Sequence, residues 1–572
     1  MKIIYKIFVI VFLLGAVNAC EITDLDLQTN PNALSPDQAS INDLYNNIQL
    51  TFKDVYRWSE DVPGQAARMY HAGAFTYAAF AGETAFTNLW NTAYSGLFPD
   101  IDALLVIAEE KGFDIHAGSA KIMKAYTLMA LVDVLGDVPF SEMGAGTDVI
   151  SPKSDPGDQV YAGAIALLDE AITQLNDTKA GAPAYDNFAG GSPEKWIKIA
   201  NTLKMRAYLN TGNASSFSSI VSSGNFISDA ADDFQFNFGN QRTNPNSRHP
   251  RYNNMYETDD GTYMSNYYMW MLNEEKLHQG AAKKDPRIRY YFYRKVDDAY
   301  DQDATTYSCH FTTLPSEDPG AKLSHYFAID PNMPYCVIAD GYLGRDHLNG
   351  EGIPPDGPTR TSWGLYPFGG EFDYDDFDDT RHQGTTGGLG QGIYPIMLSS
   401  FVDFMRAEAA LRLGTADDAR ALLERGIRGS MDKVRSFESI VASTMSLELV
   451  DRLGNAITVE KAFAMTDQDV DDYVADVLSR YDAASATNKL DIVIKEFYIA
   501  AWGNGLEAYN MYRRTGLPSN MQPGLEPGGG SGADPFPVSF LYPGVHVSRN
   551  ANVDQKDGMG IPVFWPMASG LY

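Results

Sequence analysis

The feature that most constrains the fold is a change of pattern along the chain. Helix-forming periodicity of apolar residues fills about 35–212 and 396–514, while 213–395 between them largely lacks it and is dominated by Gly, Pro, Asp, Asn and Tyr. The tail, 515–572, is again irregular. An irregular stretch as long as 213–395 is uncommon in a compact domain unless it has a function. The pattern predicts a mostly α fold with a long, loop-rich, ligand-binding insert.

Helix boundaries are marked by capping residues. Ser35-Pro36 and Ser192-Pro193 each place a capping Ser before Pro at the first helical position, and Gly112 and Gly212 follow apolar-periodic runs. Residues 57–82 are predicted to be irregular. The predicted helices are 35–53, 87–111, 117–135, 159–175, 193–211, one near 264–275, 396–413, 415–430 and 487–513.

Two distant helices resemble each other. Residues 164–172 (AIALLDEAI) align with 419–427 (ARALLERGI), and each follows another helix and a turn. Small residues at the first and eighth places allow the close helix pairing of a tetratricopeptide-like hairpin. The alternative is two ordinary amphipathic helices. Because repeated hairpins pack only on their neighbours, they also accommodate about 550 residues without one oversized core.

The N-terminus is typical of an export signal. Residues 1–19 combine two lysines, an apolar run too short to span a bilayer, and small residues before Cys20. A cysteine in this place resembles the acylated cysteine of bacterial lipoproteins, so we predict lipidation of Cys20 and a tether over 20–34. The alternative is ordinary secretion with an incidental Cys20.

Charge and cysteine content narrow the class of protein. The net charge is −30, which disfavours nucleic acid and anionic lipid surfaces as partners. In an exported chain, Cys309 and Cys336 are expected to form a disulfide, and the alternative is two free buried thiols. No phosphate loop, nucleophile elbow or zinc motif occurs in the sequence, so neither a cofactor nor a catalytic residue is predicted.

Five ordered sequence blocks carry a resemblance to a known family. They are NLWNTAY (88–94), AKIMKAY (120–126) leading into DVLGDVPFSE (133–142), KW with ANTLKMR (195–206), RAEAA (406–410), and GLEAY with RRTGLP (505–518). The chain resembles the SusD/RagB-type outer-membrane lipoproteins. This resemblance implies one domain over 35–572, a scaffold of tetratricopeptide-like helical hairpins, and a place on the outer surface of the outer membrane. It also implies a SusC-like TonB-dependent transporter as partner and an oligosaccharide or peptide as ligand.

Ligand contacts are expected from aromatic residues in the irregular segments, because rings can cover the apolar faces of sugars. Three groups are candidates, and for each the alternative is that the rings pack the insert onto the helices. They are Trp363, Tyr366, Phe368 and Tyr374; Tyr267, Tyr268 and Trp270; and Trp58, Tyr70 and Tyr77.

Other polar residues are interpreted mainly as structural. Arg513, Arg514, Asp133 and Asp137 lie in the family blocks and are expected to pair or to organise turns. The acidic run 373–379 could supply Ca²⁺ ligands but lacks the glycine and final Glu of an EF-hand, so a solvated acidic face is favoured. The sequence therefore predicts a nutrient-binding lipoprotein without catalytic chemistry. A peptide-binding member of the family, a secreted glycoside hydrolase and a tetratricopeptide-like adaptor remain alternatives.

Overall fold

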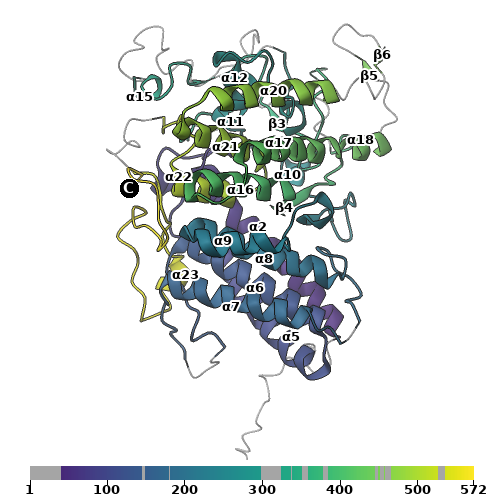
Figure 1. Cartoon of the computed structure of the whole chain (residues 1–572), viewed down its shortest axis with the longest axis vertical. Coiled ribbons are helices and arrows are strands. Elements are labelled where there is room, and N and C mark those ends of the chain that lie inside the picture. The colour runs from purple at the N-terminus through teal and green to yellow at the C-terminus, as the bar shows by residue number, and fades with distance from the viewer. Residues whose placement is uncertain are drawn as a thin grey trace, which may run out of the picture.

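The computed structural model is a mostly helical molecule elongated along one axis (Figure 1). Helices of the N-terminal part gather at its lower end, and the later helices and the insert occupy its upper end. The structure describes residues 40–571 except 145–148, 180, 298–323, 337, 351–358, 376, 378–383, 445–448, 451–455, 458–464 and 526–534. The predicted signal peptide, Cys20 and the whole predicted tether, 20–34, lie outside these residues.

The lower part is a set of packed helices. Gly118 on α6 lies so close to Leu175 of α7 that a Cβ there would come within 2.7 Å of the Leu175 side chain. The small residue therefore permits the α6–α7 hairpin. The elements are α2 (Ile41–Ala66), α3 (Tyr77–Phe80), α4 (Thr87–Asn91), η1 (Thr92–Leu97), α5 (Phe98–Lys111), α6 (Asp114–Leu135), α7 (Gly157–Leu175), α8 (Pro193–Thr211) and α9 (Ala214–Ser223).

The upper helices repeat the hairpin arrangement. Gly426 on α17 faces Phe404 of α16 at a distance where a Cβ would lie 2.9 Å from the ring, and its aligned partner Ala171 on α7 is also buried. The tetratricopeptide-like pairing predicted from the two similar segments is thus confirmed. The elements are α16 (Ser399–Leu413), α17 (Ala419–Arg435), α18 (Glu438–Thr444), α20 (Asp467–Ala483), α21 (Ala486–Ala500) and α22 (Gly505–Thr515), and the short α23 (Gly544–Val547) lies beside the lower helices.

The insert contains only short elements. β1 (Phe234–Asn237) pairs antiparallel with β4 (Ile393–Met397), and β2 (Phe292–Tyr293) with β3 (Ser362–Trp363), while β5 (Leu449–Val450) pairs with β6 (Ala456–Ile457) beyond it. The remaining pieces are η3 (Ala230–Asp232), α10 (Pro250–Asn253), η4 (Asn254–Thr258), α11 (Asn266–Trp270), η5 (Met271–Glu275), α12 (Lys276–His278), α13 (Ile288–Tyr291) and α15 (Ser324–Phe327).

Capping signals placed several helix ends correctly. The Ser192 hydroxyl accepts a hydrogen bond from the Lys195 N–H at 3.2 Å, and Pro193 begins α8. Gly112 and Gly212 close α5 and α8 with φ of 71° and 72°, a left-handed conformation that favours glycine.

Two helix predictions were wrong, and other helices were missed. Helix α2 continues to Ala66 instead of ending near residue 53, so Trp58 lies on a helix and not in a loop. The predicted 487–513 helix breaks at 501–504, where the Asn504 side chain accepts a hydrogen bond from the Glu507 N–H and starts α22. Helices α9 and α20 were not predicted. Local pattern missed these because capping side chains and tertiary packing outweigh apolar periodicity over short windows.

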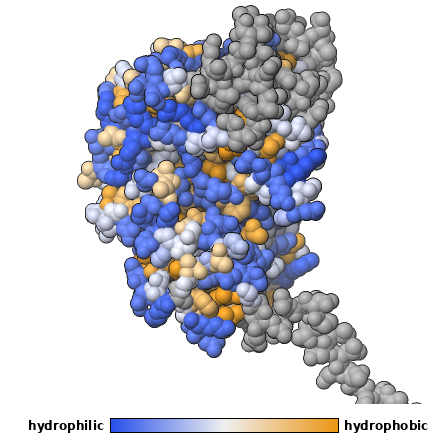
Figure 2. Space-filling view, turned by 90° about the vertical axis from the view of Figure 1, so that its right-hand side faces the viewer, coloured by the Kyte–Doolittle hydropathy of each residue, from blue (hydrophilic) through white to orange (hydrophobic). Residues whose placement is uncertain are grey.

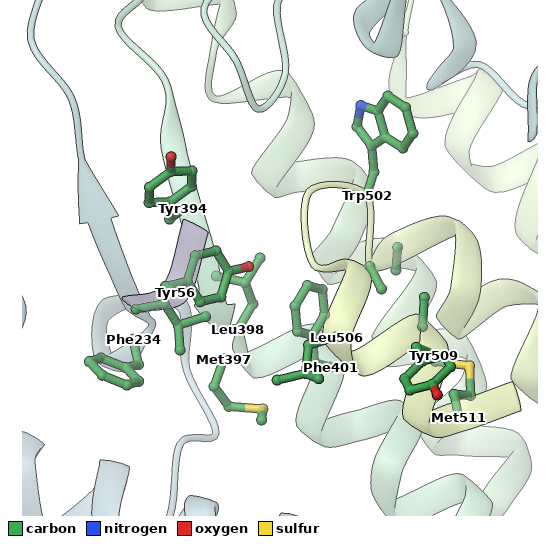
Figure 3. Close-up of a cluster of buried hydrophobic side chains, with 14 of the residues drawn as sticks. Tyr56, Phe234, Tyr394, Met397, Leu398, Phe401, Trp502, Leu506, Tyr509 and Met511 are labelled. Atoms are coloured by element: carbon green, nitrogen blue, oxygen red, sulfur yellow. The ribbon is translucent and has the colours of Figure 1, made fainter. Parts of the chain in front are cut away.

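The core is continuous from the lower helices to the insert (Figure 3). Tyr56 of α2 donates through its hydroxyl to the carbonyls of Pro395 (3.1 Å) and Gly503 (2.9 Å), so α2, β4 and the turn before α22 are tied together. Trp502 projects from that turn and is fully buried. The insert is therefore packed onto the helices by its own side chains.

A buried set of charges joins four helices, and we call it the scaffold network: Asp133 (α6), Arg206 (α8), Glu408 (α16), Glu507 and Arg514 (α22). Arg206 donates to Asp133 at 2.8 Å and to Glu507 at 2.9 Å. Arg514 donates to Glu507 at 2.8 Å and to both carboxylate oxygens of Glu408 at 2.8 Å. Each charge thus has an opposite partner, as burial of ions requires.

Candidate functional site

The four aromatic residues of the 360–374 run do not form an exposed arc. Trp363, Tyr366, Phe368 and Tyr374 are each at most 3% exposed. Trp363 and Phe368 both pack on Trp502, with 5.7 Å between ring centroids in each pair. Tyr366 stacks on Tyr291 at 5.6 Å, and Tyr374 packs edge-on against Phe372 at 4.9 Å.

The second group is buried as well. Tyr267 and Trp270 on α11 are at most 1% exposed, and their ring centroids lie 6.1 Å apart. Tyr268 packs on Trp502 at 4.6 Å and donates through its hydroxyl to the carbonyl of Ile499 at 2.9 Å. These rings attach α11 to the helices.

The third group is divided between helix surface and core. Trp58 is half-buried on α2, with the Arg57 guanidinium 4.3 Å from its ring centroid. Tyr70 packs edge-on against Trp363 at 5.8 Å. Tyr77 is 4% exposed, and its hydroxyl lies 3.0 Å from Nε2 of His347.

Most of these rings therefore pack the insert onto the helices. We call Trp502 and the rings around it, Tyr70, Tyr268, Trp363 and Phe368, the aromatic hub. Glycines allow this packing, because at Gly364 a Cβ would lie 2.3 Å from the Tyr290 carbonyl oxygen. The expectation of exposed rings on a Gly-rich backbone was wrong for this run, since the same glycines bring rings into the core.

Few large apolar side chains are exposed in the described chain. The described face in Figure 2 is mostly hydrophilic, with apolar residues in small groups. The exposed aromatic rings among the described residues are Phe75 (44%), Tyr185 (70%), Phe327 (39%) and Phe564 (39%). Two of them, Phe75 and Phe327, belong to segments that approach the stretch 347–350, the first directly and the short helix of the second through Gly524, and this region is our candidate site.

We call this site the loop surface: residues 71–77, 259–263, 324–330 and 347–350. The 347–350 segment contacts 71–77, since Gly350 approaches Phe75 so closely that a Cβ would lie 2.8 Å from that ring. His325 lies 3.0 Å from the carbonyl of Gly524, which itself packs on Leu348. Ile329, 44% exposed, adds a third apolar side chain.

Polar groups accompany the exposed rings. His71 donates from Nε2 to the carbonyl of Asn349 at 2.9 Å, which leaves Nδ1 as an acceptor. Burial lowers the pKa of His71 to about 4, so the ring is neutral at pH 7. Tyr263 packs edge-on to His71 at 6.1 Å and accepts a hydrogen bond from Arg345 at 3.0 Å. The loop surface thus offers neutral hydrogen-bonding groups beside apolar rings.

A buried carboxylate holds the loop surface in place. Asp346 accepts hydrogen bonds from the Cys336 N–H at 2.7 Å and from the amides of Gln522 at 3.0 Å and Asn266 at 3.3 Å. It is 1% exposed, and burial raises the pKa of its carboxyl group. Asp346 therefore ties the segment 343–349 to α11 and to the C-terminal tail.

The loop surface was only partly visible in the sequence. Phe75 and His71 lie in the segment 57–82, which was predicted as irregular and is so only over 67–76, between α2 and α3, but the ligand candidates named there were Trp58, Tyr70 and Tyr77. Phe327 and Arg345 were missed. Residue type carries no sign of which ring is exposed, so the only available signal was the lack of helical period around them.

The other predicted sites have different outcomes. Cys336 is disulfide-bonded, and Cys309, its predicted partner, lies outside the described residues, as does Cys20. Asp373 is fully buried and paired with Arg294 at 2.6 Å, so it belongs neither to a solvated face nor to a metal site. The described residues contain no cluster of His, Cys and acidic groups able to hold a metal ion. Arg513 and Arg514 are buried and structural, as predicted.

Two family models together cover most of the chain. One, described as starch-binding and associating with the outer membrane (SusD-like), matches residues 31–337, more than half of the chain. The other, described as SusD and RagB outer membrane lipoprotein, matches residues 391–552. The chain belongs to the SusD-like family. This membership makes it an outer-membrane lipoprotein, and no helix among the described residues has the length and apolar character to cross a membrane.

Solved structures show the same fold. A SusD/RagB family protein from Bacteroides thetaiotaomicron VPI-5482 matches with a TM-score of 0.61 and 20% identity, over 92% of this chain and 99% of that one. A chitin-binding SusD homologue from Flavobacterium johnsoniae matches with a TM-score of 0.58 and 18% identity, over 92% and 98%. No curated protein matches this chain. The tetratricopeptide-like helical fold expected from the sequence is confirmed by these likenesses.

Proposed function

We propose that this SusD-like protein binds an oligosaccharide at the loop surface and delivers it to a SusC-like TonB-dependent transporter. The observation that carries the proposal is the exposure of Phe75 and Phe327 on two segments that both approach the stretch 347–350, beside the neutral imidazole of His71. Sugars combine apolar ring faces with hydroxyl groups, and such a surface is complementary to both. The chitin-binding character of a similar protein supports a carbohydrate ligand.

The proposal assigns binding without bond cleavage. His71 is neutral and already donates to a backbone carbonyl, which fits a role in orienting hydroxyl groups. The acyl chains on Cys20 would hold the protein at the outer surface of the outer membrane. In this proposal the domain predicted over 35–572 is one ligand-binding unit and 20–34 is its tether.

The loop surface is tested by removing one exposed ring. Phe75→Ala should weaken binding of the preferred oligosaccharide about tenfold, equivalent to about 1.4 kcal/mol, measured by isothermal titration calorimetry across a panel of chitin and starch fragments. Phe564→Ala is the matched control, because Phe564 is also exposed but packs on Tyr161 outside the loop surface. Equal affinities of the two variants would reject the loop surface.

The same panel separates the alternatives. Release of reducing ends would support a glycoside hydrolase, and binding of peptides in preference to glycans would support a peptide-binding member of the family. Partner and anchor are tested in cells: Cys20→Ala should release the protein from the membrane, and purification of the anchored protein should recover the transporter. Continued membrane attachment of Cys20→Ala would reject the lipid anchor.

A further inference from the structure

A groove of about 560 Å³ lies among the lower helices and shares no lining residue with the loop surface. Its walls are α4 with η1, residues 139–144 and 149–152, and α23 with the residues that follow it, so we call it the α4–α23 groove. In Figure 1, α23 lies beside the lower helices while α15 of the loop surface lies near the upper end. Its volume is within the range of about 300–1,000 Å³ typical of ligand pockets.

A ladder of rings forms one wall of the groove. Trp90 stacks on His546 with ring centroids 4.0 Å apart and meets Tyr94 on its own helical run at 4.3 Å. Tyr94 is half-buried and donates through its hydroxyl to the carbonyl of Pro139 at 2.8 Å. The wall is therefore rigid and apolar, with the ring of Tyr94 partly open.

A buried polar atom in this ladder has no partner. His546 is 6% exposed, and its Nε2 has no hydrogen-bond partner among the described residues. Burial lowers the pKa of His546 to about 4, so the ring is neutral at pH 7. Its Nε2 can then either donate or accept one hydrogen bond, depending on the tautomer. Leaving such an atom unpaired costs about 1–3 kcal/mol, so nothing among the described residues compensates its burial.

The rim of the groove carries polar groups of both signs. Asn91 and Ser95 are exposed, and Arg549 is exposed without an ion pair to a described carboxylate. Glu142 lines the same groove and accepts a hydrogen bond from the backbone N–H of Lys153 at 2.9 Å. With a guanidinium and a carboxylate on one rim, a neutral ligand with many hydroxyl groups fits better than an ion.

We propose that the α4–α23 groove is a second saccharide-binding site, which takes one or two neutral sugar units. The ligand class rests on the proposed function, whereas the site itself does not depend on the loop surface. Tyr94, backed by the stacked rings of Trp90 and His546, would face a sugar ring, and the exposed Arg549 and Asn91 would bond its hydroxyl groups.

The first experiment measures binding stoichiometry with the full-length lipid-free chain, using chitotriose and maltotriose as probes in calorimetry. The wild-type protein should bind two equivalents of one probe, and Phe75→Ala should weaken one of these binding events about tenfold while leaving the affinity of the other unchanged. The double substitution Asn91→Ala, Arg549→Ala should remove the second equivalent. Arg242→Ala, which removes an exposed guanidinium elsewhere, is the matched control and should keep both.

The second experiment locates the ligand by fluorescence. Saccharide binding should change the emission of Trp90 by at least about 10%, and this change should disappear in Trp90→Phe, which keeps an aromatic ring. Ser95→Tyr, at an exposed lining position, should fill the groove and abolish the change without affecting the fold.

The outcomes separate this inference from the proposed function. Saccharide binding that is lost in Phe75→Ala and unchanged in every groove variant would overturn the groove and leave the proposed function standing. Binding that survives Phe75→Ala but not the groove variants supports the groove. Failure of both probes and of the wider glycan panel to bind any form would overturn both.

Discussion

The scaffold network and the aromatic hub hold together adjacent parts of one molecule by different physical means. The network pairs charges with near-ideal geometry on α6, α8, α16 and α22, so each member specifies the position of the others. The hub packs rings at varied angles around Trp502, from 31° for Tyr268 to 67° for Phe368. Directional contacts thus define the scaffold, whereas non-directional apolar contacts attach the insert.

This difference between the network and the hub indicates where amino-acid substitutions are tolerated. A buried ion without its partner is strongly destabilising, so the network does not accept partial replacement. Rings of similar size can be exchanged in a core with smaller losses. We therefore expect substitutions in the hub to be milder than substitutions in the network, and the loops beyond the hub to be free to change with the ligand.

The largest expected effect tests the network. Arg514→Ala leaves Glu408 and Glu507 buried without their shared guanidinium and should lower the free energy of unfolding by about 3–5 kcal/mol, measured by urea denaturation. The control is Arg420→Ala, which removes an exposed pair with Asp482 and should cost about 0–1 kcal/mol. Equal losses for the two variants would show that the buried pairs do not specify the scaffold.

A smaller effect is expected in the hub. Trp502→Phe keeps a ring but leaves a small cavity, and should lower the free energy of unfolding by about 1–2 kcal/mol while making the insert cleave faster in limited proteolysis. Trp58→Phe, on the half-buried face of α2, should have less effect on both readouts. A loss for Trp502→Phe as large as that of Arg514→Ala would contradict the proposed difference between the two regions.

The smallest expected effect is a change in how the free energy of unfolding depends on pH. Burial alone would raise the pKa of Glu408, but Arg514 and Arg412 together hold it below its ordinary value. The stability from this lowered pKa is complete above the unfolded pKa of about 4.3 and is lost as pH falls through the folded value. Glu408→Gln should therefore show a smaller loss of stability between pH 6 and pH 3 than the wild type, in urea denaturation at each pH.

Asp403, on the same helix as Glu408, is expected to change stability with pH in the opposite direction. Burial raises the pKa of Asp403 despite its pairing with Arg425, so its contribution to stability grows as pH falls through the folded value. Asp403→Asn should lose more stability than the wild type on acidification. The same pH response in the two variants would rule out this account of the network's electrostatics.

Much of the scaffold could be predicted from the sequence. Ser192-Pro193, Gly112 and Gly212 marked helix ends because capping depends on neighbours in the chain. The structural reading of Arg513, Arg514 and Asp133 was also correct, since they lie on apolar-periodic helices where a charge needs a buried partner. The break at 501–504 was missed because it is stabilised by distant groups, such as Tyr56 donating to the Gly503 carbonyl.

What the sequence by itself determined is therefore the class of fold, the family and most helix ends, all of which depend on periodicity and on residues close in the chain. Only the tertiary structure decided which rings are available to a ligand. Trp363 and Phe75 both stand in irregular, Gly-containing segments, yet the first is 2% exposed and the second 44%. The physical reason is that burial is set by contacts with residues far away in sequence, here Trp502 and Tyr70 around Trp363.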